Sequence, residues 1–115
     1  MTKHLGDFEY LILLAIVRLK PDAYGATIHQ AIEERTHRSI AIGAVYTGLA
    51  RLQRQGLISS SIGAPSPKRG GRRKKFYHLE SAGAAALARS YGDYRRMIEG
   101  IEPELNTLLP RADRP

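Results

Sequence analysis

The chain has 115 residues and a net charge of +7, enough for one domain with a modest hydrophobic core. It contains no cysteine, which excludes disulfides and thiolate metal sites and is compatible with a reducing cytosol. The apolar run at residues 10–17 is too short to span a bilayer, and Asp7 and Glu9 stand where a signal peptide needs positive charge. We therefore expect a cytoplasmic protein without a membrane segment.

The positive charge is concentrated in the middle of the chain. Residues 35–79 contain ten Lys or Arg and no Asp or Glu, whereas the rest has 8 basic and 11 acidic residues, a net charge of −3. This asymmetry indicates a polyanionic partner that touches one part of the protein. Nucleic acid is the first candidate, and an anionic membrane surface is the second.

Residues 8–19 form the first predicted helix, with Asp7 as a plausible N-cap. Its apolar residues extend most of the way around the helix, more than one small core can cover. We therefore expect part of it, including Leu11 and Leu14, to contact a second subunit. The alternative is a fully internal helix.

Two further helices are predicted over residues 24–35 and 42–56, after a break at residues 20–22. A connector joins them, with a residue or two of strand around Ser39 and Ile40. The spacing places Val45, Leu49 and Leu52 of the third helix against the core and small or basic residues outside, and Gly56 ends this helix. Two helices joined in this way are typical of a helix-turn-helix.

Two strands are predicted next, over residues 57–62 and 73–79, joined by a long turn rich in Gly and Pro. Six of the eight residues from 68 to 75 are Lys or Arg. Taken alone, such a run is as often a solvated loop or a localisation tract. A cationic hairpin directly after a helix-turn-helix indicates a winged helix.

A long helix is predicted after the hairpin. Its apolar residues step by four and three, as in a heptad seam that favours dimerisation over packing within the chain. Pro103 predicts a kink or a fresh helix start near Glu102. The fold class is therefore mainly α with a small β-hairpin: a winged helix-turn-helix domain over residues 1–80, a dimerisation helix over residues 81–109 and a frayed tail over residues 110–115. The seam consists of Leu87, Tyr91, Tyr94, Ile98, Ile101, Leu105 and Leu108.

Residues 46–57 resemble the Tyr-x-x-Leu-x-Arg-Leu-x-x-x-Gly-Leu signature of PadR-type transcriptional regulators. Tyr24-Gly25 and residues 71–79, followed by Gly83, support the likeness, which covers roughly residues 5–100. The resemblance implies a bacterial winged-helix repressor that dimerises through its first and last helices, in the compact subgroup with a single short C-terminal helix. Glu80 departs from the family's frequent Thr, so Ser81 is expected to cap the last helix.

A dimer would place two copies of the third helix about one DNA turn, ~34 Å, apart in successive major grooves of a pseudo-palindromic operator. Thr47 and Ala50 would approach base edges, Arg51 and Arg54 would bind guanine or only a phosphate, and Tyr46 would contact a phosphate or pack half-buried. The wing would supply phosphate contacts. The complete set expected at DNA is Gly43, Tyr46, Thr47, Ala50, Arg51, Arg54, Lys68, Arg69, Arg72, Arg73, Lys74 and Lys75.

The resemblance also implies release from DNA by a small hydrophobic or aromatic effector, for which Leu87, Tyr91 and Tyr94 are the candidate pocket. The expected dimer interface comprises Leu11, Leu14, Leu87, Tyr91, Tyr94, Ile98, Ile101 and Leu105. The four histidines are scattered without metal-ligand spacing and no phosphate-binding loop is present, so we expect no enzyme, cofactor or metal. A module that binds RNA or another protein remains the alternative function.

Overall fold

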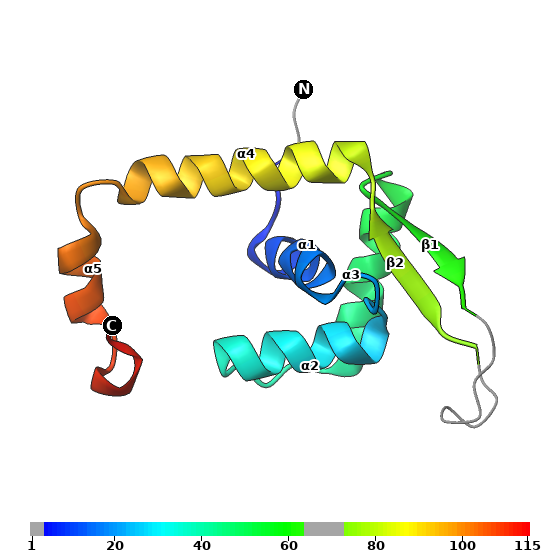
Figure 1. Ribbon diagram of the computed structural model, residues 1–115, viewed down its shortest axis with the longest axis horizontal. Coiled ribbons are helices and arrows are strands. Elements are labelled where there is room, and N and C mark those ends of the chain that lie inside the picture. The colour runs from blue at the N-terminus through cyan, green and yellow to red at the C-terminus, as the bar shows by residue number, and fades with distance from the viewer. Residues whose placement is uncertain (1–3, 64–72) are drawn as a thin grey trace.

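A computed structural model describes residues 4–63 and 73–115 (Figure 1). It confirms the mainly helical fold with one β-hairpin. The elements in chain order are α1 (Asp7–Leu19), α2 (Gly25–Thr36), α3 (Ile42–Arg54), β1 (Ile58–Ile62), β2 (Lys75–Leu79), α4 (Ser81–Ile98), α5 (Glu102–Leu108) and a short 3₁₀ helix (Arg111–Asp113). Among the described helices, none combines the length and apolarity that crossing a membrane requires.

The hydrophobic core lies between α1, α2, α3 and the hairpin. α1 is central, because it packs against α2, α3, α4 and β2 (Figure 1). Ile12, Ile16, Ile28 and Leu49 are completely buried there. The prediction of a helix at residues 8–19 is confirmed, although Gly6 rather than Asp7 is its N-cap.

The connector between α2 and α3 is held by side chains instead of by a strand. The predicted strand around Ser39 and Ile40 is wrong: this segment has no regular structure. Glu33 accepts a hydrogen bond from the amide of Ile40 at 3.0 Å, and His29 Nε2 lies 2.7 Å from the Ile40 carbonyl oxygen. Arg38 forms an ion pair of 2.6 Å with Asp7 at the start of α1. These contacts orient α3 relative to α1 and α2.

The hairpin is attached to the start of α2. β1 and β2 are antiparallel, with Ser60 opposite Tyr77. Phe76 forms an isolated bridge with Tyr24, and the two rings meet edge to face at 5.5 Å. The amide of Tyr77 donates to the Ala23 carbonyl at 2.8 Å. The hairpin is therefore fixed against the helix-turn-helix along its second strand.

The C-terminal region contains two helices, where a single dimerisation helix with a kink or a fresh start at Pro103 was expected. α4 ends at Ile98, Gly100 has a positive φ of 89°, and α5 begins at Glu102 with Pro103 in its first turn. A fresh start near Glu102 was predicted from Pro103 and is confirmed. Glu80, not Ser81, is the N-cap of α4, and its side chain makes no capping hydrogen bond.

The segment after Pro110 was expected to be frayed. It forms the 3₁₀ helix Arg111–Asp113, and the Arg114 guanidinium donates to the carbonyls of Leu109 and Thr107, each at 2.9 Å. Two hydrogen bonds therefore connect the chain end to α5. Residues 91–109, the second half of α4 and α5, extend away from α3 and the hairpin and are called the C-terminal arm below (Figure 1).

Candidate nucleic-acid interface

α3 has one buried face and one exposed face. Val45, Leu49 and Leu52 are completely buried, as the spacing predicts. Every α3 residue expected at DNA lies on the exposed face. The structure leaves Gly43, Tyr46, Thr47, Ala50, Arg51 and Arg54 exposed. α3 therefore presents an uninterrupted outer surface of small and basic residues.

Tyr46 is both a packing residue and an exposed one. Half of its side chain is exposed (50%), and its ring lies directly against Gly25 at the start of α2. A Cβ atom added at Gly25 would collide with the Tyr46 ring and hydroxyl, so only glycine allows this approach. The Tyr46 hydroxyl is thereby held beside the N-terminus of α2, where helix amides favour an anion.

Two lysines at the start of β2 lie on opposite faces of the strand. Lys74 Nζ lies 5.0 Å from the centre of the Tyr24 ring, next to α2. Lys75 Nζ lies 5.8 Å from the centre of the Tyr77 ring, on the side facing α3. Alternation along the strand therefore directs one cation toward α2 and the other toward α3. Both contacts are in the range of cation–π attraction.

An open recess of about 550 Å³ lies between the exposed face of α3 and the hairpin. Tyr46, Ala50 and Arg54 border it, with Lys75 on the opposite wall. Its side chains offer hydroxyl, guanidinium and ammonium donors, which are suited to phosphate oxygens. We call the α3 outer face together with this recess the basic face.

Two residues that line the recess, Gln53 and Tyr77, were not predicted from the sequence as binding residues. Gln53 donates to Ser60 Oγ at 3.0 Å and so connects α3 to β1. Tyr77 is buried, and the pKa of its phenol is raised. The main cause is burial, and the nearby Tyr46 adds to it. Tyr77 lies at the recess because its side chain is on the face of β2 that is turned toward α3. The alternation of side chains along a strand could have indicated this face once the pairing of β1 with β2 was known.

Lys68, Arg69 and Arg72 lie outside the described residues, whereas Arg73 is described and exposed. Within the described ranges, no group of three or more His, Asp or Glu side chains could hold a metal ion. His78, for example, lies 2.7 Å from Ser61 Oγ on the hairpin.

Comparisons with known proteins bear directly on this architecture. Residues 13–89 match the model of the transcriptional regulator PadR-like family. The chain belongs to the PadR-like family. It is therefore a DNA-binding transcriptional regulator and not an enzyme, and the resemblance noted in its sequence is confirmed.

Individual proteins are similar to this chain in sequence or in structure. A crystal structure of a PadR family transcription regulator from Clostridium difficile R20291 is 25% identical, with a TM-score of 0.67 and coverage of 87% of this chain and 98% of that one. The Streptococcus mutans UA159 protein smu.1704 is 26% identical, with a TM-score of 0.67 and coverage of 96% and 99%. An uncharacterised Lysinibacillus sphaericus protein is 32% identical over 99 residues, 84% of this chain and 86% of its own.

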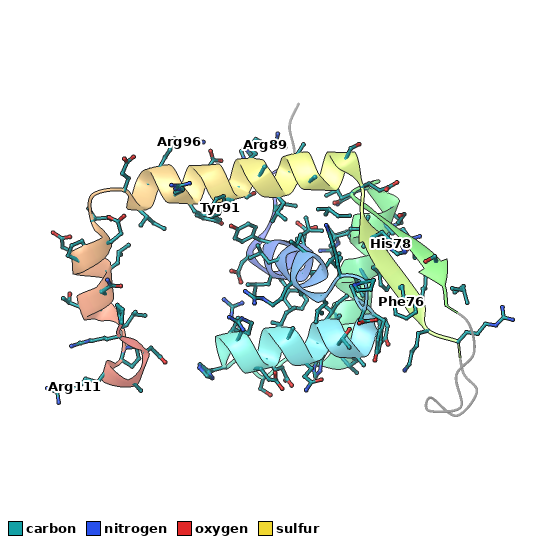
Figure 2. All side chains as sticks on the ribbon, viewed as in Figure 1. Phe76, His78, Arg89, Tyr91, Arg96 and Arg111 are labelled. Carbon is teal, nitrogen blue, oxygen red and sulfur yellow. The ribbon has the colours of Figure 1, made fainter. Side chains whose placement is uncertain are left out.

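In this PadR-like chain, the surfaces expected at a dimer interface are partly exposed. Leu14 is 38% exposed on α1, while Leu11 is half-buried. Tyr91 projects from the side of α4 that faces α1, whereas Arg89 and Arg96 project from its outer side (Figure 2). Exposed side chains also include Tyr94, Ile98 and Ile101, and Leu105 is half-buried.

The expected effector pocket is only partly assembled in one chain. Tyr91 and Tyr94 border a recess of about 360 Å³, in which Tyr10 and Ile98 supply further apolar surface. Tyr94 packs on Tyr10 with ring centres 5.3 Å apart. The pKa of Tyr10 is raised, mainly by burial and further by Tyr94 and Tyr91. Leu87 does not border this recess, because it packs against the hydrophobic core.

Proposed function

We propose that the chain is a repressor that binds a pseudo-palindromic operator as a homodimer through the basic face. The observation that carries the proposal is the pairing of Arg54 on α3 with Lys75 on β2 across one open recess. A DNA backbone entering this recess would meet cations on both walls while α3 lies against the major groove. The hairpin would then follow the adjacent backbone, with Arg73 and Lys74 adding phosphate contacts.

Base contacts are assigned to the middle of α3. Thr47 and Ala50 have short side chains on the exposed face and would let the helix backbone approach base edges. Arg51 and Arg54 are long enough for guanine or a phosphate. Two or three base contacts of this kind per subunit set the register, and the phosphate contacts supply most of the affinity.

The homodimer is supported by apolar surface that one chain leaves in water. Leu14 and Val17 of α1 are 38% and 42% exposed, and Met97 and Tyr91 of α4 are 79% and 54% exposed. Several large apolar side chains left exposed on two helices favour a protein–protein contact. A two-fold dimer would bury it twice and would repeat the basic face for a palindromic operator.

We also propose that a small aromatic or hydrophobic effector binds beside Tyr91 and Tyr94. The recess they share with Tyr10 has a volume in the range of small-molecule sites. It lies on the same side of α4 as the proposed dimer contact, so a ligand there would alter the spacing of the two α3 helices.

Binding to the DNA upstream of the protein's own gene tests the proposed function. We expect a gel shift at nanomolar protein with that DNA, competed poorly by unrelated duplex DNA and by RNA of the same length. Equal competition by RNA would favour an RNA-binding module and contradict the proposal. For the effector, aromatic acids and planar aromatic drugs should quench tyrosine fluorescence and release the operator.

A further inference from the structure

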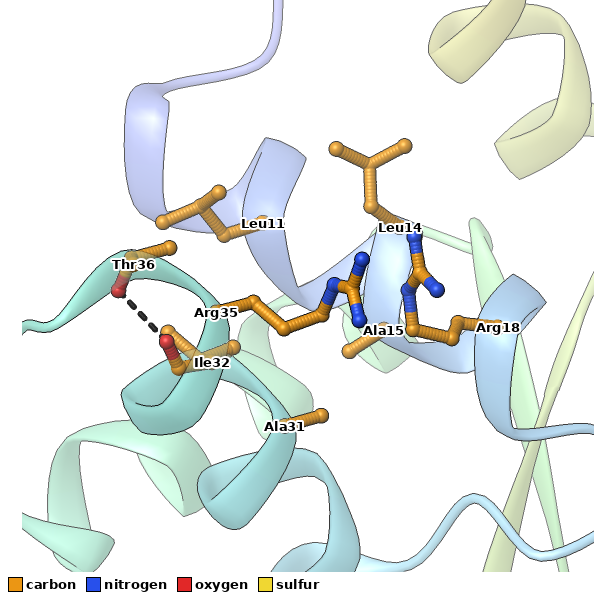
Figure 3. A pocket seen from close by; sticks show the side chains of 8 residues that line it. All are labelled: Leu11, Leu14, Ala15, Arg18, Ala31, Ile32, Arg35 and Thr36. Carbon is orange, nitrogen blue, oxygen red and sulfur yellow. Dashed lines mark hydrogen bonds between the residues drawn. The ribbon is translucent and has the colours of Figure 1, made fainter. Parts of the chain in front are cut away.

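A small apolar pocket lies between α1 and α2, and none of its lining residues borders the recess of the basic face. Its volume is about 130 Å³, suitable for one leucine-sized side chain. Two arginines flank an otherwise apolar floor (Figure 3). The lining residues are Leu11, Leu14, Ala15, Arg18, Ala31, Ile32, Arg35 and Thr36.

The two arginines lack an acidic partner in the part of the chain that the structure describes. Arg18 of α1 and Arg35 of α2 point toward one another across the pocket (Figure 3). Neither appears in an ion pair among the described residues, where the pairs are His29–Glu33, Arg38–Asp7 and Arg96–Asp93. Two like charges beside apolar surface repel each other, so an anionic partner that enters this pocket is favoured.

α5 has the complementary character. It carries Glu102 and Glu104 in its first turn, has no basic residue and buries no side chain. Leu108, on the same helix, is 78% exposed. Glu102 accepts only a hydrogen bond from the Gly100 amide, and Glu104 forms no ion pair within the described residues. This helix therefore has both an apolar and an acidic surface without a partner.

We propose that the pocket receives α5 of a second copy of this chain, with Glu102 and Glu104 against Arg18 and Arg35 and with Leu108 in the apolar floor. The inference rests on the proposed homodimer and names the contacts that close it. Each chain's own α5 lies across an open space from its own α2, at the far end of α4 (Figure 1). In a two-fold dimer the exchange occurs twice, so each arm would clasp the partner's body.

A second copy accounts for more of the molecule than a free ligand does. A small carboxylate would neutralise Arg18 and Arg35, but it would leave the exposed apolar side of α5 in water. Docking of α5 pairs both charge sets and buries Leu108 and Leu14 together. The pocket is also continuous with Leu11 and Leu14, which were already expected at the dimer interface.

A charge-exchange experiment tests the proposal with two variants. One has a reversed pocket, Arg18→Glu with Arg35→Glu; the other has a reversed arm, Glu102→Arg with Glu104→Arg. Alone, each homodimer would place like charges together at both sites. In an equimolar mixture, the heterodimer pairs acidic with basic groups at both sites. All four side chains are on the surface, so circular dichroism should show wild-type helix content.

Sedimentation equilibrium measures the outcome. We expect a dimer dissociation constant at least ~10-fold higher for each variant and recovery to within about threefold of the wild-type value in the mixture. Arg54→Glu with Lys75→Glu is the control matched to the reversed pocket, because it also exchanges two cations for two carboxylates, here on the basic face, and should leave dimerisation unchanged.

Three results would overturn the proposal. The first is wild-type dimerisation by both variants. The second uses hexanoate as a small carboxylate probe: if the pocket variant loses hexanoate binding but dimerises as the wild type does, the pocket is a carboxylate site. Weakened variants that mixing fails to restore would place the charges in a different contact. A wild-type chain that is monomeric at micromolar concentration would instead reject the homodimer itself, so the two failures are distinguishable.

Discussion

The body of the molecule and its C-terminal arm have similar apolar content but use it differently. Among the described residues, fifteen hydrophobic residues are buried in the core; fourteen of them lie between Leu5 and Tyr77, and the other, Ala86, belongs to α4. No residue from 91 to 109 is buried, although this arm contains Tyr91, Met97, Ile98 and Leu108. The body has completed its core within one chain, whereas the arm has not.

The apolar groups of the two regions therefore contribute to different free energies, that of folding and that of association. Apolar groups in the body stabilise the monomer, because their burial requires only intramolecular folding. Apart from Tyr94, which packs on Tyr10, the apolar groups of the arm find little cover within the chain, so their further burial requires another molecule and depends on concentration. Substitutions in the two regions should therefore be distinguishable by measurement of unfolding and of association on the same protein.

The largest effect is expected from Leu49→Ala in the body. Leu49 is completely buried on α3, and truncation leaves a cavity that costs about 2–5 kcal/mol of unfolding free energy. Met97→Ala in the arm should change the unfolding free energy of a monomeric sample by less than about 0.5 kcal/mol. Urea unfolding at low protein concentration checks both. Equal destabilisation would mean that the arm is part of the monomer's core.

The next effect concerns DNA affinity. Arg54→Ala with Lys75→Ala should weaken operator binding roughly 100-fold, because a dimer loses four phosphate contacts and each contributes about 0.9 to the salt slope. Arg96→Ala is the matched control: Arg96 is on the outer side of α4 and pairs with Asp93. Fluorescence anisotropy from 50 to 300 mM salt separates the variants. An unchanged salt slope would remove Arg54 and Lys75 from the interface.

A smaller effect is expected at the contact between α2 and α3. Gly25→Ala places a methyl group into the ring of Tyr46 and should cost about 1–3 kcal/mol of unfolding free energy through overpacking. Gly43→Ala makes the same chemical change where nothing lies within 4 Å, so a stabilising change of up to about 1 kcal/mol is expected. Thermal unfolding of both variants measures the difference, and equal stabilities would contradict the packing of Tyr46 on Gly25.

The smallest effect involves the ion pair that holds the helix connector. The hydrogen bond from Arg38 lowers the pKa of Asp7. Because the folded-state pKa is below the unfolded one, the pair stabilises fully above the unfolded pKa of about 3.9, and this stability is lost as pH falls through the lowered value. Arg38→Ala should lower the free energy of unfolding only slightly at pH 7, because the pair is exposed to solvent, and should leave it unchanged near pH 2. If the difference in unfolding free energy between the wild type and Arg38→Ala stays constant across this pH range, the Asp7 carboxylate is not the partner of Arg38.

Local patterns predicted much of this structure. The 3.6-residue period identified the buried face of α3 through Val45, Leu49 and Leu52, and the outer face followed from the same spacing. The hairpin followed from β-branched and aromatic runs on either side of a Gly- and Pro-rich turn. These elements are defined by residues close together in the sequence, so no tertiary contact was needed to predict them.

The misassigned features depend on contacts between distant residues. The backbone of Ile40 is hydrogen-bonded by the side chains of Glu33 and His29 from α2 instead of by a neighbouring strand, so the strand expected around Ser39 and Ile40 does not form. Leu87 fits the heptad seam by spacing, but the path of α4 across α1 places it against the core. The heptad pattern also continued across Gly100, whereas in the structure the positive φ of Gly100 separates α4 from α5.

Hydroxyl-radical footprinting of the operator tests the central claim most directly, namely that the basic face is used twice in one dimer. The account predicts two protected patches on the same side of the duplex, separated by about one helical turn of ~10 base pairs, that disappear together in the Arg54→Ala and Lys75→Ala variant. A single protected patch, or two patches that persist in this variant, would contradict it.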